Sequence, residues 1–169
     1  MADDRPIFRS LIAPADCALI LIDGPGIAES DGMGDMSEPL AALLEAAERH
    51  GVPALLLARE KGGRASGHYP VLSYRPINPL ADPDVRRALA AFNRARLIIG
   101  GDHAETALTF FVLSALEEGY DVYLLRELCL GACELLAETA AARMIQAGAV
   151  PISVPQVVTE WRCMLPLAV

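Results

Sequence analysis

The sequence predicts an α/β fold of three layers, in which helices cover both faces of a parallel sheet of six strands. Two observations lead to this prediction. Short apolar runs alternate with longer stretches of helical periodicity, which is the pattern of repeated βαβ units. The runs are apolar at consecutive positions rather than at every second one, so both faces of the sheet must be covered.

The apolar runs are the predicted strands. They are bounded by turn residues, and all but one are strongly apolar. The weakest run covers residues 71–74. In chain order the predicted strands cover residues 17–22, 53–58, 71–74, 95–99, 121–125 and 150–154.

Five helices are predicted between and after these strands. Residues 36–50 place leucine and alanine on one stripe and charged side chains opposite, as expected for a helix packed on a sheet. Asp82 is a capping acid followed by a proline at the first helical position. Gly119 and Gly148 are placed to end two later helices. The predicted helices cover residues 36–50, 82–92, 104–118, 133–146 and 155–161.

The size and composition of the chain predict one soluble domain over residues 1–169. Although 53% of the residues are hydrophobic, no apolar run approaches the ~20 residues that cross a bilayer. The first ten residues carry acids early and lack the basic-then-apolar order of a signal peptide. We therefore expect a cytoplasmic protein.

Charge and cysteine content narrow the expected partners. The chain has 22 acidic and 14 basic residues, a net charge of -8, which argues against nucleic acid and anionic membranes. Its four cysteines form no CxxC pair and have no histidine at ligand spacing, so neither a metal site nor disulfides are expected. The expected partner is a small-molecule substrate, with no cofactor.

Asp23 is the first candidate for chemistry. It ends an apolar strand and precedes the glycine-rich stretch 24–35, at the sheet edge where open α/β proteins place their sites. A carboxylate held against apolar surroundings gains proton affinity, which suits a general acid or base. The alternative is a structural aspartate whose side chain caps the following turn. Both interpretations stay open at this point.

A second candidate segment joins the fourth predicted strand to its helix. Two glycines, at 100 and 101, allow a sharp turn, and the following helix start offers N–H groups to an anion or oxyanion. The turn carries Asp102, His103, Glu105 and Thr106. Such a turn is only weak evidence for a site, because every βα connection needs some turn chemistry.

Arg75 and Cys129 complete the set of candidates. Arg75 follows the third predicted strand and is followed by two prolines, so it is positioned, although a surface arginine is the alternative. Cys129 lies just past the predicted end of the fifth strand and could reach the same edge as Asp23. Its alternative is a buried cysteine that acts as a small apolar residue.

Taken together, the blocks of sequence resemble the isochorismatase-like superfamily, also called cysteine hydrolases, and within it the YcaC-type branch. The resemblance runs from residue 18 to Trp161. The matching blocks are residues 18–23, 75–82, 96–101, 113–122 and 143–149, at the spacings of the family.

The resemblance implies a catalytic set and a missing member. Such enzymes use an Asp after the first strand, a Lys or Arg after the third and a nucleophilic Cys. Asp23 and Arg75 match the first two. The position of the Cys, six residues after Gly101 and twelve before Gly119, holds Ala107. A methyl group cannot attack a carbonyl, so the thioester route of the family is closed.

Two further departures from the family surround this position. The first-strand Asp is normally followed by a bulky residue and Gln or Asn, whereas here residues 24–26 are Gly-Pro-Gly. The turn before the nucleophile normally carries small apolar residues and Thr, whereas residues 102–106 include two acids and a histidine. These departures indicate a rebuilt pocket with more polar groups. The two acids and the histidine are either the result of relaxed drift after loss of the nucleophile or new acid–base machinery.

The favoured hypothesis is a hydrolase or lyase that acts on a small biosynthetic intermediate by acid–base chemistry of Asp23. The resemblance supplies a precedent, since isochorismatases proper lack the Cys and hydrolyse a vinyl ether. Arg75 would hold an anionic substrate group or keep the charge of Asp23 in check. His103 and Glu105 would supply a second proton-transfer group. The expected substrate-binding residues are Gly101, Asp102, Glu105, Thr106, Ala107 and Cys129.

Two alternatives and one assembly prediction accompany this hypothesis. The chain is a catalytically silent binding or assembly protein, or its nucleophile has moved to Cys129 or Thr106. The resemblance also implies a homodimer or larger homo-oligomer. Residues 110–113 are apolar at four consecutive helical positions, so this helix or residues 161–169 should be buried between copies.

Overall fold

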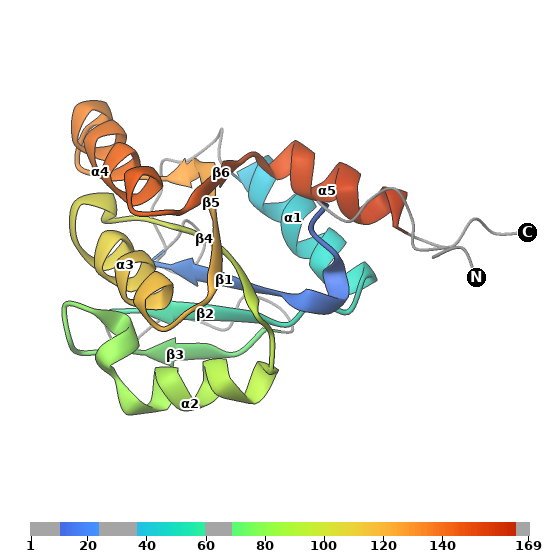
Figure 1. Cartoon of the computed structure of the whole chain (residues 1–169), viewed down its shortest axis with the longest axis horizontal. Helices are drawn as coiled ribbons and strands as arrows, with labels where there is room; N and C mark the ends of the chain where they lie inside the picture. Colours follow the sequence, from blue (N-terminus) through green and yellow to red (C-terminus); the bar gives the residue numbers. More distant parts are fainter. Residues whose placement is uncertain (1–10, 24–36, 60–68, 165–169) are drawn as a thin grey trace, which may run out of the picture.

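The computed structural model describes residues 11–23, 37–59 and 69–164, and it confirms the predicted fold class. All six strands pair in parallel in one sheet with the order β3-β2-β1-β4-β5-β6 (Figure 1). The strands are β1 (Cys17–Ile22), β2 (Ala54–Ala58), β3 (Val71–Ser73), β4 (Arg96–Gly101), β5 (Asp121–Cys129) and β6 (Val150–Ile152).

The five predicted helices are present, with bounds that differ by at most five residues from the predicted ones. Asp82 caps its helix as expected, since its side chain accepts the N–H of Asp84 over 3.0 Å. The helices are α1 (Ser37–Arg49), α2 (Pro83–Phe92), α3 (Thr109–Glu117), α4 (Glu134–Gln146) and α5 (Val154–Cys163). Three shorter helical segments are η1 (Pro14–Asp16), η2 (Pro79–Ala81) and η3 (Ala104–Leu108).

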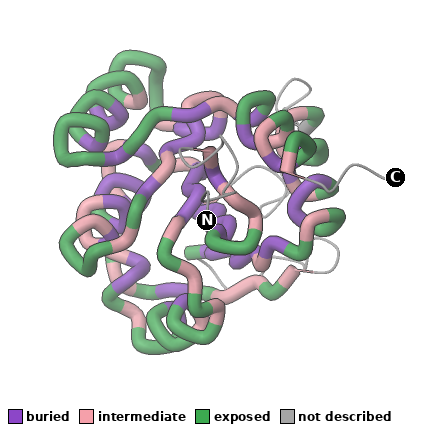
Figure 2. Tube along the Cα trace, turned by 45° about the vertical axis from the view of Figure 1, so that its right-hand side comes forward, coloured by how far each residue is buried: buried purple, intermediate pink, exposed green. Residues whose placement is uncertain are grey.

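The helices form two layers around the sheet. Helices α1 and α5 cover one face and α2, α3 and α4 the other (Figure 1). Along β1, alternate side chains enter the two resulting cores, with Ile20 and Ile22 under α3 and Leu19 and Leu21 under α1 and α5. Every residue of β1 and β2 is buried, and exposed residues lie on the outer helix surfaces (Figure 2). This double burial explains why the strands are apolar throughout.

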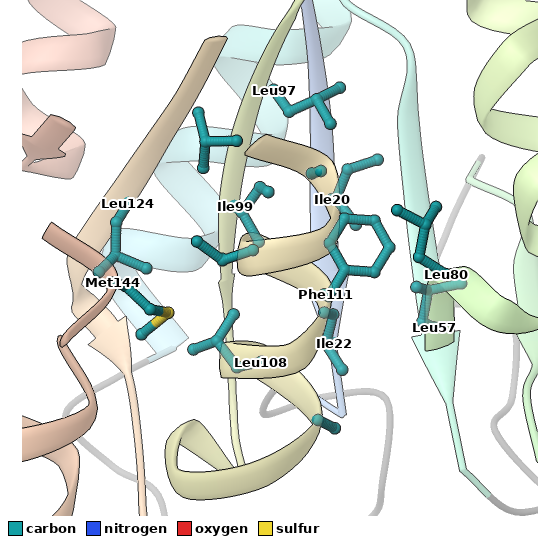
Figure 3. Close-up of a cluster of buried hydrophobic side chains, with 14 of the residues drawn as sticks. Ile20, Ile22, Leu57, Leu80, Leu97, Ile99, Leu108, Phe111, Leu124 and Met144 are labelled. Atoms are coloured by element: carbon teal, nitrogen blue, oxygen red, sulfur yellow. The ribbon is translucent and has the colours of Figure 1, made fainter. Parts of the chain in front are cut away.

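The core under α3 fixes the carboxyl edge of the sheet. Leu108 of η3 and Phe111 of α3 belong to the same buried cluster as Ile22 and Ile99, which lie near the ends of β1 and β4 (Figure 3). Both aromatic and aliphatic side chains here are fully buried. The backbone of these strand ends is therefore held by tight packing, which gives the residues that follow them defined positions.

Strand β5 is longer than predicted, so the predicted position of Cys129 beyond the end of this strand is wrong. The register between β4 and β5 shifts between Ile99 and Gly101, and pairing then resumes with Gly101 opposite Cys129. Because the extra residues of β5 are accommodated in this irregularity, the strand continues to Cys129 instead of ending at residue 125. Cys129 is thus the last residue of the strand and not part of a loop beyond it.

The helix predicted from residue 104 begins differently from a regular α-helix. Residues Ala104–Leu108 form a single π-helical turn, and the α-helix α3 starts only at Thr109. The Thr109 hydroxyl donates to the carbonyl of Ala104, and the N–H of Leu108 lies 3.4 Å from the carbonyl oxygen of His103. Such π-turns are uncommon and often occur at functional sites.

Some predictions lie outside the described residues. They concern the first ten residues, the glycine-rich stretch 24–35 and the last five residues of the chain. A search of the described helices finds none long and apolar enough to span a bilayer. That residues 1–169 form one domain stays a prediction.

Candidate active site

The candidate site lies where the order of the strands reverses. From β1 the chain proceeds to β2 and β3 on one side, and it then returns to place β4 on the other side of β1. In open α/β sheets, ligands bind in the crevice outside the carboxyl ends of the strands at such a point. Asp23 follows β1 and Asp102 follows β4, directly after the paired residues Ile22 and Gly101.

Asp23 is held in an unusual backbone conformation. Its φ of 45° lies in the left-handed region, which residues other than glycine adopt at a cost. Its own N–H donates to the carbonyl of Leu57 over 2.7 Å, so the residue continues the pairing of β1 with β2 before the chain turns away. Backbone strain of this kind is concentrated at active sites and ligand clamps.

Both carboxylate oxygens of Asp23 accept a hydrogen bond. The backbone N–H of Arg59 donates to Oδ1 over 2.7 Å, and the Tyr74 hydroxyl donates to Oδ2. Arg59 follows β2 and Tyr74 follows β3, so the side chain of Asp23 connects the ends of three adjacent strands. The structure thus combines the two sequence-based interpretations of Asp23, because the carboxylate stands at the sheet edge and also anchors neighbouring turns.

Tyr74 was not among the predicted site residues. Its side chain is fully buried, and its N–H donates to the carbonyl of Ala58 over 3.0 Å. Burial raises the pKa of the Tyr74 hydroxyl well above its usual value near 10, the hydrogen bond to Asp23 adds to the rise, and the charge of Arg59 opposes it. The hydroxyl is therefore a neutral donor. The available signal was a tyrosine at a buried strand end, where its O–H needs a partner.

Arg75 does not contact Asp23, so it does not hold the charge of that carboxylate in check as one of its two expected roles required. The residue is exposed, and among the described residues it makes no hydrogen bond or ion pair with Asp23. Successive residues of an extended chain point to opposite sides, so the inward position of Tyr74 directs Arg75 outward. Arg75 therefore stands on the solvent side of the edge.

The end of β4 brings a second group of predicted residues to the same edge. The N–H of Asp102 donates to the carbonyl of Ile22 over 2.8 Å, and its carboxylate accepts the N–H of His103 over 2.6 Å. His103 is exposed and, like Asp23, has a left-handed backbone, with a φ of 55°. The imidazole therefore stands at the surface of the edge, where substrate and solvent can reach it.

Two of the N–H groups at the start of the helix after β4 are already paired with carbonyl groups of the protein. The N–H of Ala104 donates to the carbonyl of Leu130 over 2.7 Å, and that of Thr106 to the carbonyl of His103 over 2.9 Å. The first of these bonds ties the π-turn to the chain that leaves β5, and the second lies within the turn itself. An oxyanion would have to compete with them, so the expected anion site is not formed by these two groups.

Glu105 lies beneath the turn that follows β5. Its Oε1 is 3.4 Å from the N–H of Ala132, and its Oε2 is buried without a hydrogen-bond partner among the described residues. A Cβ on Gly131 would lie only 2.8 Å from Oε2, so the glycine permits the close approach of this turn. The predicted binding residue Glu105 therefore faces the protein as well as the edge.

Ala107 and Cys129 are both buried at this edge. Ala107 is only 2% exposed and packs in the core under the π-turn. Burial raises the pKa of the Cys129 thiol to about 11, with Arg126 opposing the rise. Since the thiolate is the reactive form, Cys129 is an inert, largely protonated thiol at neutral pH. This agrees with its interpretation as a small apolar residue.

The edge gathers Asp23, Asp102, His103 and Cys129 at the ends of three neighbouring strands. The described part of the chain holds no cluster of three or more metal-ligating side chains. The edge carries the Asp23 carboxylate, which has two fixed donors and a strained backbone, together with the exposed imidazole of His103 and the carboxylate of Asp102. These groups can transfer protons and bind polar substrate atoms.

Comparison with known proteins identifies the fold. No family model and no curated protein matches the sequence. Among solved structures, YcaC of Pseudomonas aeruginosa with hexane-2,5-diol and covalent acrylamide has a TM-score of 0.79 at 24% identity, over 92% of this chain and 84% of that one. YcaC of Escherichia coli, described as an octameric hydrolase of unknown specificity, has a TM-score of 0.78 at 25% identity, over 94% and 84%.

A more distant structure extends the same likeness. A cysteine hydrolase from Pseudomonas syringae has a TM-score of 0.73 at 15% identity, over 95% of this chain and 99% of that one. The agreement covers nearly the whole length of each protein and includes proteins described as hydrolases. The chain therefore has the fold of the isochorismatase-like cysteine hydrolases.

Proposed function

We propose that the protein is an isochorismatase-like hydrolase or lyase that acts on a small biosynthetic intermediate without a cysteine nucleophile. The observation that carries the proposal is the Asp23 carboxylate. It stands at the switch point of the sheet on a strained backbone, with a fixed donor on each oxygen. A positioned carboxyl group at such a place is suited to general acid–base catalysis.

The absence of a nucleophile at residue 107 supports this choice of chemistry. The resemblance aligns Ala107 with the nucleophilic Cys of the family, and the alanine is buried. The thiol of Cys129 is buried at the same edge, where desolvation raises its pKa to about 11. Neither position offers an activated thiolate, so a route through a thioester is disfavoured.

Hydrolysis of a vinyl ether is the reaction that best fits these groups. Asp23, as the acid, gives its proton to the terminal carbon of the double bond, and an oxocarbenium ion results. Water adds to this ion and loses a proton to His103 or Glu105. The hemiketal then separates into a ketone and an alcohol. Arg75, at the solvent side of the edge, would bind an anionic group of the substrate.

A silent binding or assembly protein is the second candidate, and one observation favours it. Each oxygen of Asp23 already has a donor from the protein. In a silent protein the carboxylate would have a purely structural role, which is to join the ends of β1, β2 and β3. In that case the crevice would bind a small molecule without turnover.

A substrate screen separates the two candidates. The purified protein is incubated with small carboxylate-bearing vinyl ethers and with amides and nitriles of similar size, before and after treatment with iodoacetamide. We expect turnover of vinyl ethers that survives the treatment. Turnover of amides that is lost on treatment would contradict the proposal. Ligand binding detected by calorimetry with no turnover of any compound would favour the silent protein.

A further inference from the structure

We propose that Tyr74, and not Arg75, is the positioning residue whose contact sets the proton affinity of Asp23. The inference rests on the proposed role of Asp23 in proton transfer. It starts from the contact that the structure records, in which the Tyr74 hydroxyl donates to Oδ2 of Asp23 while Arg75 is exposed.

The position of the Tyr74 hydroxyl is fixed by its surroundings. The side chain has no exposed surface and belongs to the same buried cluster as Leu57 and Leu80. Its backbone N–H donates to the carbonyl of Ala58 over 3.0 Å, which ties the residue to the end of β2. A ring enclosed in this way cannot turn to another partner, so the hydroxyl and the carboxylate stay together.

A neutral donor and a cation have different effects on a carboxylate. Both stabilise the ionised form of the carboxyl group, but a cation at contact distance does so more strongly and therefore lowers its pKa further. The Tyr74 hydroxyl therefore lowers the proton affinity of Asp23 through one oriented hydrogen bond, and by less than a guanidinium in contact would.

Other charged groups at the edge also surround the carboxylate of Asp23. Arg59 follows β2 and carries the only positive charge in the described part of the chain that affects the pKa of Tyr74. Asp102 and His103 follow β4, on the other side of Asp23. None of these changes when the Tyr74 hydroxyl alone is removed, so the contribution of the contact can be isolated.

Carbon-13 NMR of aspartate carboxyl groups measures this contribution without an enzyme assay. Protein labelled at the aspartate carboxyl carbon is titrated, and Asp23→Asn identifies the signal of Asp23. Tyr74→Phe keeps the ring and removes the donor, so the midpoint of this signal should move to higher pH by about one unit. Tyr69→Phe is the matched control, because its hydroxyl donates to the carbonyl of Leu44 over 2.9 Å.

The outcomes decide the inference separately from the proposed function. An Asp23 midpoint that is the same in Tyr74→Phe, Tyr69→Phe and the unaltered protein would overturn the inference. If Tyr74→Phe does not fold, uniform 3-fluorotyrosine keeps the hydroxyl and strengthens it as a donor. The midpoint should then fall, and an unchanged midpoint would again overturn the inference. Absence of turnover in a substrate screen would contradict only the proposed function, since the midpoint is measured without substrate.

Discussion

The backbone N–H of Asp102 donates to the carbonyl oxygen of Ile22 over 2.8 Å, and this bond joins the ends of β1 and β4. Two of the candidate residues, Asp23 and Asp102, are thereby fixed side by side at the switch point of the sheet. The contact depends on Gly101, because a Cβ at this position would lie 2.0 Å from the same carbonyl oxygen.

Gly101→Ala should therefore destabilise the protein strongly. The residue has a φ of 150°, and the added methyl group would overlap the backbone of Ile22. Strain and overpacking together predict a loss of about 3 kcal/mol in the free energy of unfolding, measured in urea. Gly51→Ala is the control. Its φ is 65° with nothing within 4 Å, so only about 1 kcal/mol should be lost. Equal losses in the two variants would contradict the close contact.

The four cysteines should react in an order set by burial. Cys133 and Cys163 are exposed, whereas burial raises the pKa of Cys17 to about 12 and that of Cys129 to about 11. At pH 8 iodoacetamide should modify the two exposed thiols first, because little thiolate exists at the buried ones. Peptide mass spectrometry measures the order. Modification of Cys129 ahead of Cys133 would favour the alternative of a relocated nucleophile.

Assembly of the protein is predicted from the surface of α3. Phe111 and Val112 are buried within the chain, while Phe110 is 39% exposed, so the core leaves one of these consecutive apolar side chains uncovered. Trp161 is buried by its own chain and does not reach the surface. The octameric state described for YcaC of Escherichia coli is consistent with an assembly.

Light scattering at micromolar concentration should find a homo-oligomer, and Phe110→Asp should shift it toward the monomer by placing a charge in an apolar contact. Glu117→Asp, an exposed position on the same helix, is the control and should leave the assembly unchanged. If the unaltered protein is a monomer, the prediction is wrong and the exposure of Phe110 does not reflect an interface between copies.

The sequence predicted the fold because the information is local. Continuous apolar runs identify buried parallel strands, and Asp82 and Gly119 mark helix ends by residue type alone. The place of Asp23 at the carboxyl edge follows from the same reasoning. Only the resemblance singled out Ala107, and its correspondence to the family cysteine stays a proposal.

The contacts of the site were not predictable, because they join residues far apart in the chain. Tyr74 and Asp23 are 51 residues apart, and their contact depends on β3 and β1 being separated by only one strand. The extension of β5 to Cys129 depends on a register shift that only pairing with β4 reveals. Likewise, the N–H of Ala104 is occupied by Leu130, a residue from a different strand connection.

Turnover by Asp23→Asn is the most direct test of the proposed chemistry. The substitution preserves the shape of the side chain and an oxygen that can accept the Arg59 N–H, but it removes the titrating group. With a vinyl ether substrate found by screening, the account predicts that kcat falls by about 10²–10⁴-fold in this variant. It also predicts that the unaltered protein keeps its kcat after its exposed thiols are blocked. An Asp23→Asn variant with unchanged kcat would contradict the account.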